Sequence, residues 1–373
     1  MKTHKKILYY SDHLKGKRTA QAVHSKEFVR AVKEYSKFSI SYYPPISKDN
    51  MEKNFSNKTK KIFLIPGKIK KFLINKREWR KLKKVIKKEK PDVIIARHNF
   101  LFISVIKKLV NIPLPFILEV NGLVEYSFNF TGKKKQKKLV SLENEILEKS
   151  NFIFTISEIF KSGIISKGFN ENKVAVFPNA VDVEKFNPSN CETKENKNEF
   201  IIGYIGSSMP GRDIKTLIEA YKIVKKKLPD TRLELIGNFK SKCNIEGVVY
   251  RGTIAHDNIP KEINRMDITV APYFKTHTDR CSPLKILEYM AMEKPVITTK
   301  GKMAESIFLD ETEKHIYIPE NPKSLANVII KIYENDELRK EMGVKARGIV
   351  MNNFNYKRYI TRLDKICEEN LIR

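Results

Sequence analysis

The sequence predicts an α/β protein made of two Rossmann-like, doubly wound domains. Short apolar strands alternate with longer amphipathic helices along the whole chain, which is typical of parallel sheets covered by helices. The alternation stops once, at residues 189–198, which are polar and charged without a large apolar residue, and then restarts. With 373 residues, the chain is long enough to bury a sizeable core in each domain.

These observations predict four segments. The first domain covers residues 1–188, the linker 189–198 and the second domain 199–355. The remaining residues, 356–373, carry an amphipathic pattern, and we expect this helix to pack back on the first domain.

In the first half, apolar runs bounded by turn residues predict the strands, and periodic apolar residues predict the helices. Ser157 is expected to cap the helix that follows it. The predicted strands are 6–10, 38–43, 93–96, 115–120, 152–155 and 174–177, and the predicted helices are 19–35, 100–110, 139–149 and 157–166.

The second half repeats the pattern. Its helices are expected at 213–227, at 259–265, from Pro283 onward, and at 322–335 and 336–350. The predicted strands are 201–205, 233–236, 248–250, 268–270, 294–298 and 316–318.

Composition excludes several classes of protein. The four cysteines are far apart and the seven histidines are scattered, so neither a disulfide framework nor a transition-metal site is expected. No apolar run reaches the ~20 residues that span a bilayer, and the N-terminal apolar run is too short for a signal sequence. These features predict a cytoplasmic protein.

The net charge of +29 indicates an anionic partner. Residues 58–90 are crowded with lysine and arginine interleaved with apolar side chains, and Lys133–Lys138 form a second cluster. A solvated helix face and a surface for anionic lipids both remain open as interpretations. Nucleic acid is disfavoured, because no stacking aromatic pattern or recognition helix accompanies the charge.

Residues 280–297 indicate a phosphate-binding helix start. Ser282 is a suitable N-cap, Pro283 suits the first helical position, and Lys285 adds a positive charge to the free amides of the first turn. Glu288 lies on the same helix and could accept from the hydroxyls of a ribose. The alternatives are an ordinary helix start and a Glu288 that pairs with Lys285 on an exposed face.

A second loop, residues 206–212, lies between a strand and a helix. Gly206 would let a ligand approach the backbone, and Arg212 stands at the helix start for a phosphate. The glycines at 203, 206 and 211 lack the spacing of a dinucleotide site, which disfavours a dehydrogenase. Gly16, in the first loop of the chain, would permit close approach of an acceptor or a donor phosphate.

Several of these pieces together resemble the retaining glycosyltransferases of family 4, which have the GT-B fold. The matching segments run along nearly the whole chain: 91–94, 155–157, 177–182, 206–220 and 282–298. The resemblance implies two Rossmann-like domains facing across a cleft. It also implies that a nucleotide diphosphate sugar binds mainly to the second domain and the acceptor to the first.

By position, Glu288 matches the second glutamate of the family's E-x7-E motif, which is expected to hold the ribose, and Arg212 matches the residue that meets the diphosphate. Three positions depart from the family pattern. Arg280, next to Asp279, replaces the first glutamate, and Ser207 stands where many members have arginine. Asn121 stands where several have a histidine near the reacting centre, although Asn-Gly is also a common turn.

The resemblance implies a retaining, hexosyltransferase-type enzyme that needs neither metal nor cofactor, because cations and helix amides accept the leaving diphosphate. A lipid-linked or saccharide acceptor in polysaccharide or glycolipid assembly, at the inner face of the cell membrane, is expected. The alternatives are a nucleotide-sugar epimerase and a polyanion- or membrane-binding protein. The predicted catalytic residues are Arg212, Lys285 and Asn121; the donor-binding residues are Gly206, Ser207, Arg212, Ser282, Leu284, Lys285 and Glu288; Gly16 is assigned to the acceptor or phosphate loop.

Overall fold

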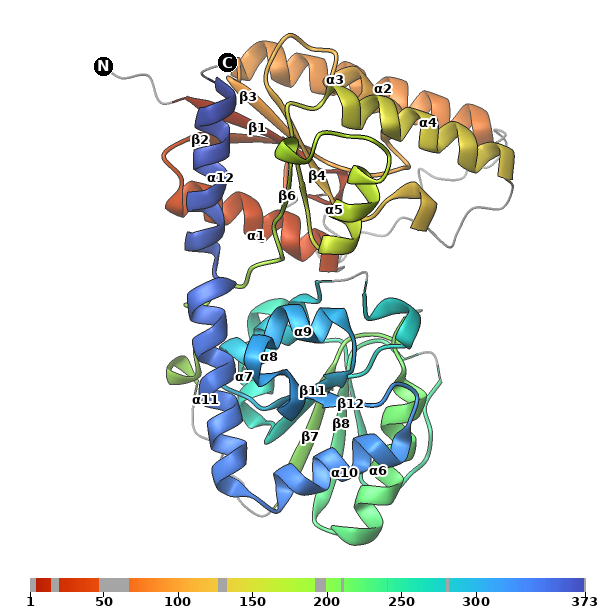
Figure 1. Cartoon of the computed structure of the whole chain (residues 1–373), viewed down its shortest axis with the longest axis vertical. Coiled ribbons are helices and arrows are strands. Elements are labelled where there is room, and N and C mark those ends of the chain that lie inside the picture. The colour runs from red at the N-terminus through yellow and green to blue at the C-terminus, as the bar shows by residue number, and fades with distance from the viewer. Residues whose placement is uncertain are drawn as a thin grey trace, which may run out of the picture. The chain divides into compact units, whose positions relative to one another are not determined.

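Two compact units make up the structure, a computed structural model, and each is built on a six-stranded parallel sheet (Figure 1). The first unit comprises Met1–Pro178 with Lys357–Arg373, and the second comprises Asn179–Tyr356. The predicted α/β class with two doubly wound sheets is confirmed. The structure describes residues 5–14, 20–46, 67–126, 133–191, 199–208, 211–239, 241–279 and 282–371.

The sheet of the first unit has the strand order β2-β1-β3-β4-β5-β6. Successive residues of β1 face opposite sides of it: Leu8 and Tyr10 pack with one group of helices, while the ring of Tyr9 lies 4.5 Å from that of Phe28. The strands are β1 Lys6–Tyr10, β2 Ser39–Tyr43, β3 Val93–Arg97, β4 Phe116–Val120, β5 Phe152–Thr155 and β6 Val174–Val176.

Helices cover both faces of this sheet (Figure 1). Helices α2 to α5 pack on the face of Leu8, and α1 and α12 on the other. The ring of Tyr359, on α12, lies 6.2 Å from Phe28 and 5.2 Å from Phe177. The helices are α1 Ala20–Tyr35, α2 Gly67–Glu89, α3 Ile103–Leu109, α4 Lys133–Lys149, α5 Glu158–Ile165 and α12 Tyr356–Leu371.

The sheet of the second unit has the order β12-β11-β10-β7-β8-β9. Helices α6 and α10 share a core on one face, and α7, α8 and α11 share a core with α9 on the other. The strands are β7 Phe200–Ile205, β8 Thr231–Ile236, β9 Val248–Gly252, β10 Ile268–Ala271, β11 Val296–Thr299 and β12 Ile316–Tyr317; the helices are α6 Ile214–Lys227, α7 Ile259–Arg265, α8 Leu284–Ala291, α9 Lys302–Phe308, α10 Pro322–Tyr333 and α11 Asp336–Asn353.

Helix α6 shows how the sequence fixes an element next to the site. Leu217, Tyr221 and Val224 recur at helical spacing and are fully buried against the sheet. Asp213 caps the helix, because its Oδ1 accepts a hydrogen bond of 3.1 Å from the backbone amide of Thr216. The cap therefore fixes the residue at which the helix begins.

The first unit ends at Pro178 rather than at residue 188, where the sequence suggested a domain boundary. The segment after Pro178 packs within the second unit: the amide of Val181 donates to the carbonyl of Phe354 at 2.8 Å, and Phe186 belongs to the core around α8. Of the predicted linker, residues 192–198 lie outside the described residues.

One further expectation in the first unit was wrong, and a second is confirmed only in part. Helix α4 begins at Lys133 rather than at Leu139, since a run of lysines has adequate helix propensity and joins the helix as its first turns. Ser157 is the N-cap residue of α5, but its side chain makes no capping hydrogen bond.

None of the helices in the described ranges combines the length and the apolarity needed to cross a membrane.

Candidate functional site

Two glycine turns meet at the carboxyl end of the second sheet. Gly206 follows β7 with φ of +150°, and Gly237 follows β8 with φ of +140°. The amide of Gly206 donates to the carbonyl of Ile236 at 2.8 Å, and a Cβ on Gly237 would collide with the carbonyl of Gly206. The two turns therefore lie against each other, at the sheet edge where α/β proteins bind ligands.

Lys285 lies directly over the first of these turns. Its Nζ is 3.0 Å from the hydroxyl of Tyr204 and 4.1 Å from the centre of the Tyr204 ring. The same hydroxyl donates to the carbonyl of Ser207 at 3.1 Å, so it accepts from the ammonium. A Cβ on Gly206 would collide with Nζ, so glycine is what leaves room for the cation.

Tyr204 stays neutral while it holds this cation. Burial raises the pKa of its hydroxyl to about 12, and the nearby charge of Arg212 only partly opposes that rise. A neutral phenol offers Lys285 a hydrogen-bond acceptor and a π face without cancelling its charge.

Arg212 is held in the same way by a second tyrosine. Its guanidinium lies over the ring of Tyr273, 4.4 Å from the centroid, and the backbones of the two residues form an antiparallel bridge. The charge of Arg212 acts on the hydroxyl of Tyr204, and the same hydroxyl accepts from Lys285, so both predicted diphosphate-binding cations influence Tyr204.

Helix α8 begins one residue later than the sequence suggested, at Leu284, with Pro283 as its N-cap residue and without a capping side chain. Ser282 is not the cap. Its Oγ accepts a hydrogen bond of 3.0 Å from the amide of Asn179, whose side chain in turn donates to the carbonyl of Ser282. The hydroxyl is therefore used to fasten the segment after Pro178, and the first turn of α8 has no side-chain cap to compete with an anion.

Glu288, one turn along α8 from Leu284, contacts His256 rather than serving as a simple exposed partner of Lys285. Its Oε1 lies 2.9 Å from His256 Nε2, and only 12% of its side chain is exposed. The structure thus brings Gly206, Ser207, Arg212, Lys285 and the start of α8 together, with Glu288 on the same helix.

Asn121 lies in the first unit, just after β4, where its Nδ2 donates to Glu119 Oε1 at 2.8 Å. Glu119 is fully buried, and His24, Arg97 and Tyr9 also donate to its carboxylate. Burial alone would raise the pKa of Glu119, but Arg97 and His24 lower it to about 2. An ionised Glu119 can only accept, so it fixes which way the Asn121 amide points.

Two residues named from the sequence cannot be placed. Gly16 and Arg280 lie outside the described residues. Asp279, next to Arg280, has its Oδ1 3.2 Å from the amide of Lys302 and so accepts from the first turn of α9. In the described part of the chain, no group of three His, Cys, Asp or Glu residues is arranged to hold a metal ion.

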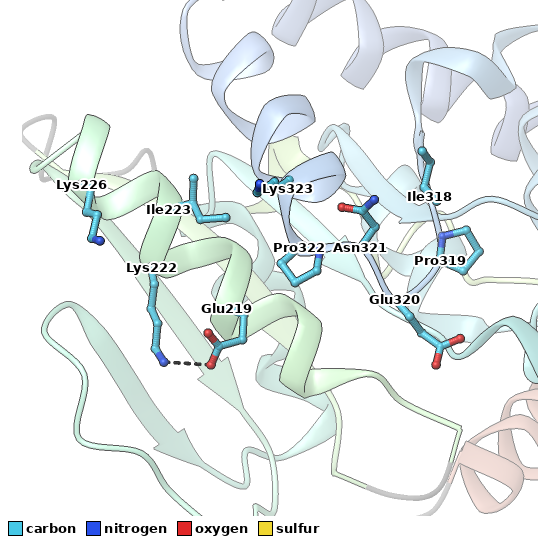
Figure 2. Close-up of a pocket in the computed structure, with 10 residues that line it drawn as sticks. All are labelled: Glu219, Lys222, Ile223, Lys226, Ile318, Pro319, Glu320, Asn321, Pro322 and Lys323. Atoms are coloured by element: carbon cyan, nitrogen blue, oxygen red, sulfur yellow. Dashed lines mark hydrogen bonds and ion pairs between the residues drawn. The ribbon is translucent and has the colours of Figure 1, made fainter.

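A hollow of about 670 Å³ lies on the second unit between α6 and the segment entering α10 (Figure 2). An ion pair of 2.8 Å between Lys222 and Glu219 lies at one side of it. The predicted donor-binding residues are not part of this wall, so the hollow is distinct from the glycine-turn site. Its lining residues are Glu219, Lys222, Ile223, Lys226, Ile318, Pro319, Glu320, Asn321, Pro322 and Lys323.

Comparison with known families identifies both halves of the chain. The family described as "Glycosyltransferase Family 4" matches residues 44–185, and the family described as "Glycosyl transferases group 1" matches residues 189–348. The chain is a family 4 glycosyltransferase. The resemblance inferred from the sequence is therefore confirmed.

One relative of this glycosyltransferase matches nearly its whole length, and another matches about half of it. An uncharacterized glycosyltransferase of Methanocaldococcus jannaschii is 20% identical, with 96% of each chain covered. The capsular polysaccharide biosynthesis glycosyltransferase CapM of Staphylococcus aureus is 28% identical over 54% of this chain and 57% of its own.

Solved structures confirm the GT-B fold. Sucrose-phosphate synthase from Thermosynechococcus elongatus superposes with a TM-score of 0.72 at 16% identity, covering 98% of this chain and 99% of the other. HepE of Anabaena, solved in complex with UDP-glucose, has a TM-score of 0.68 at 15% identity, with 98% and 100% covered.

Several residues that surround the predicted donor-binding residues were missed in the sequence. Tyr204 and Tyr273 end buried strands or follow them, where an aromatic residue looks like ordinary core, and only the fold shows the cations above their rings. Gly237 carried a usable signal, because it is a glycine directly after a strand, as Gly206 is.

Proposed function

We propose that this glycosyltransferase transfers a hexose from a nucleotide diphosphate sugar to an acceptor hydroxyl, with retention at the anomeric carbon and without a metal ion. One observation carries the proposal: two cations, Lys285 and Arg212, are held on tyrosine faces beside the glycine turns and the uncapped start of α8. As the glycosidic bond breaks, negative charge develops on the diphosphate. Fixed cations and amides stabilise that charge without having to reorganise.

In this proposal Gly206 and Ser207 give the diphosphate close access to the backbone, and Glu288 meets the ribose. A uridine nucleotide is the donor we favour, because HepE, which shares the fold, has been solved with UDP-glucose. The likeness to CapM supports an acceptor in polysaccharide or glycolipid assembly. The role of Asn121 as a catalytic residue stays a prediction.

The test is a transfer assay with UDP-hexoses and saccharide or lipid-linked acceptors, in the presence of EDTA, with the product anomer assigned by NMR. We expect product of the donor's own anomeric configuration, and no loss of rate with EDTA. An inverted product would contradict retention. A changed sugar formed from donor alone would instead indicate an epimerase.

We also propose that the enzyme binds anionic membrane surfaces through the helical layer α2–α3–α4, whose helices lie side by side on the first unit (Figure 1). Exposed cations line α2, and the apolar side chain of Ile74 on the same helix is 45% exposed. Each Lys or Arg near an anionic surface contributes about 1 kcal/mol of attraction. The exposed cations of α2 are Lys76, Arg77, Arg80, Lys81, Lys83, Lys84, Lys87 and Lys88.

Reversing four of these charges should reduce binding to phosphatidylglycerol vesicles at least tenfold in a sedimentation assay. Neither the wild type nor this variant should bind phosphatidylcholine vesicles. A control with four reversed charges on the second unit has the same net charge and should bind like the wild type. Equal losses in both variants would show that only net charge matters, which would contradict a defined surface. The test variant is K76E/R80E/K83E/K87E, and the control is K226E/K227E/K323E/K331E.

A further inference from the structure

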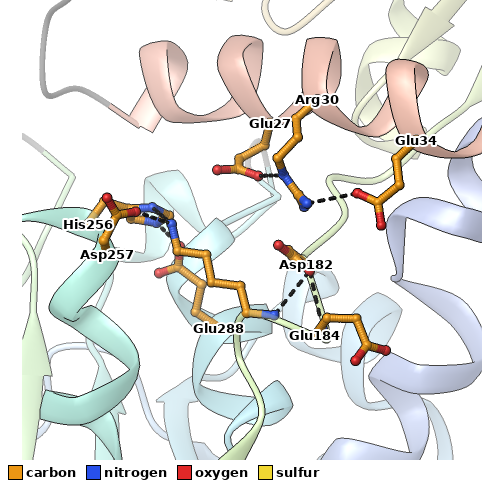
Figure 3. Close-up of polar contacts among 9 residues, drawn as sticks. Glu27, Arg30, Glu34, Asp182, Glu184, His256, Asp257 and Glu288 are labelled. Atoms are coloured by element: carbon orange, nitrogen blue, oxygen red, sulfur yellow. Dashed lines mark hydrogen bonds and ion pairs between the residues drawn. The ribbon is translucent and has the colours of Figure 1, made fainter. Parts of the chain in front are cut away.

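His256 connects Glu288 to a segment that the sequence did not link to the site. It begins the short turn His256–Asn258, which follows β9, and its Nε2 lies 2.9 Å from Glu288 Oε1. On its other side, Nδ1 is 3.1 Å from Lys185 Nζ. Figure 3 shows His256, Asp257 and Glu288 close together in the second unit.

The chemistry of these three groups fixes where the imidazole proton is. The ammonium of Lys185 can only donate, so Nδ1 must accept and carries no proton. The proton of the neutral ring is then on Nε2, which donates to the carboxylate of Glu288. Lys185 thereby selects the tautomer of His256 that can hold Glu288.

The surroundings keep this arrangement in place. Lys185 Nζ also lies 2.6 Å from Oδ1 of Asp257, whose side chain is 90% exposed, and the ring of His256 is 5.6 Å from that of Phe186. The side chains of Lys185, His256 and Glu288 are 20%, 27% and 12% exposed. Partly buried hydrogen bonds of this kind restrict a carboxylate to one orientation, and Oε1 is the oxygen that is engaged.

We propose that His256 is a positioning residue: together with Lys185, it holds the carboxylate of Glu288 in the orientation that accepts hydrogen bonds from the ribose hydroxyls of the donor. The inference rests on the proposed function, in which Glu288 meets the ribose. In this arrangement, discrimination between ribose and deoxyribose depends on His256, which does not itself contact the sugar. A site with a well-oriented acceptor rejects a ligand that lacks the matching hydroxyl.

The experiment compares dissociation constants measured by calorimetry for UDP, ADP and GDP and for their 2′-deoxy and 3′-deoxy counterparts. In the wild type, at least one deoxy form should bind tenfold or more weakly than its parent. His256→Ala should reduce that ratio at least fivefold by weakening the parent nucleotide alone. His256→Gln should recover most of the ratio, since its amide can donate from nearly the position of Nε2. Lys185→Met should give an intermediate ratio, because the tautomer is no longer selected.

Lys222→Met is the matched control, an exposed lysine in an ion pair on α6 whose loss should leave all constants unchanged. If His256→Ala keeps the wild-type ratio, the positioning role is wrong while the proposed function stands. If the ratio of dissociation constants for His256→Gln is as low as that for His256→Ala, a hydrogen bond donated from this position does not orient Glu288. The positioning role is then also overturned. If the wild type binds none of the nucleotides, or does not distinguish ribose from deoxyribose, the proposed function itself fails at Glu288.

Discussion

Replacing Lys285 with alanine is expected to lower kcat/KM for sugar transfer by roughly 10²–10³-fold, the cost of removing one preorganised group that stabilises developing charge. The ammonium lies on the face of Tyr204, directly over Gly206, so the substitution removes the positive charge from this glycine turn. Lys285→Glu and Arg212→Glu place a negative charge at the proposed diphosphate site, and we expect them to abolish transfer. Steady-state kinetics with saturating acceptor measures the effect.

Lys261→Ala, an exposed lysine on α7, should have the activity of the wild type. Circular dichroism and the melting temperature should show that all variants fold. If transfer survives both charge reversals, the proposed stabilisation of the leaving diphosphate is wrong.

The largest expected loss of stability comes from Glu119→Ala, which should lower the free energy of unfolding of the first unit by about 3–5 kcal/mol. The carboxylate accepts hydrogen bonds from Tyr9, His24, Arg97 and Asn121, and without it the buried guanidinium of Arg97 has lost its counter-ion. The sequence has one tryptophan, Trp79, which packs against the core of the first unit. Its fluorescence during urea unfolding therefore reports on this unit.

Glu148→Ala, an exposed carboxylate on α4, is the matched control and should change the unfolding free energy by less than about 0.5 kcal/mol. The double variant Arg97→Met with Glu119→Leu should be more stable than Glu119→Ala, because it leaves no unpaired buried charge. A Glu119→Ala protein as stable as the wild type would contradict this account.

The ion pair of Glu119 with Arg97 also makes the stability of the first unit depend on pH. Because the pKa of Glu119 falls from its ordinary value of 4.5 to about 2 in the folded protein, its contribution is complete above about pH 4.5 and is lost as the pH falls toward 2. The difference in urea midpoint between wild type and Glu119→Gln should narrow over that range.

Regular elements could be predicted from the sequence because their causes are local. The helix predicted over 213–227 is α6, which the structure stabilises by the local stripe of Leu217, Tyr221 and Val224 and by the cap at Asp213. The start of α8 was misplaced by one residue for a tertiary reason: Asn179, distant in sequence, occupies the hydroxyl of Ser282. The sequence pattern around Ser282 could not show that its hydroxyl binds the amide of Asn179.

The site divides in the same way. The types and order of Gly206, Arg212, Lys285 and Glu288 were enough to propose a donor-binding set. What holds each charge in place was not available from the sequence, because Tyr204, Tyr273 and His256 reach these residues only through the fold. Charged residues of a site can be recognised in the sequence by their type, whereas the residues that hold them in place are recognised only from distances in the folded structure.

The first unit is discontinuous in sequence, since α12 follows the whole of the second unit along the chain. Residues 179–356 are translated before Tyr359, whose ring packs against those of Phe28, Phe154 and Phe177. Domains generally fold as units while the chain emerges. Here the first unit cannot complete its aromatic cluster until the second unit has been translated, because Tyr359 follows the second unit in the chain.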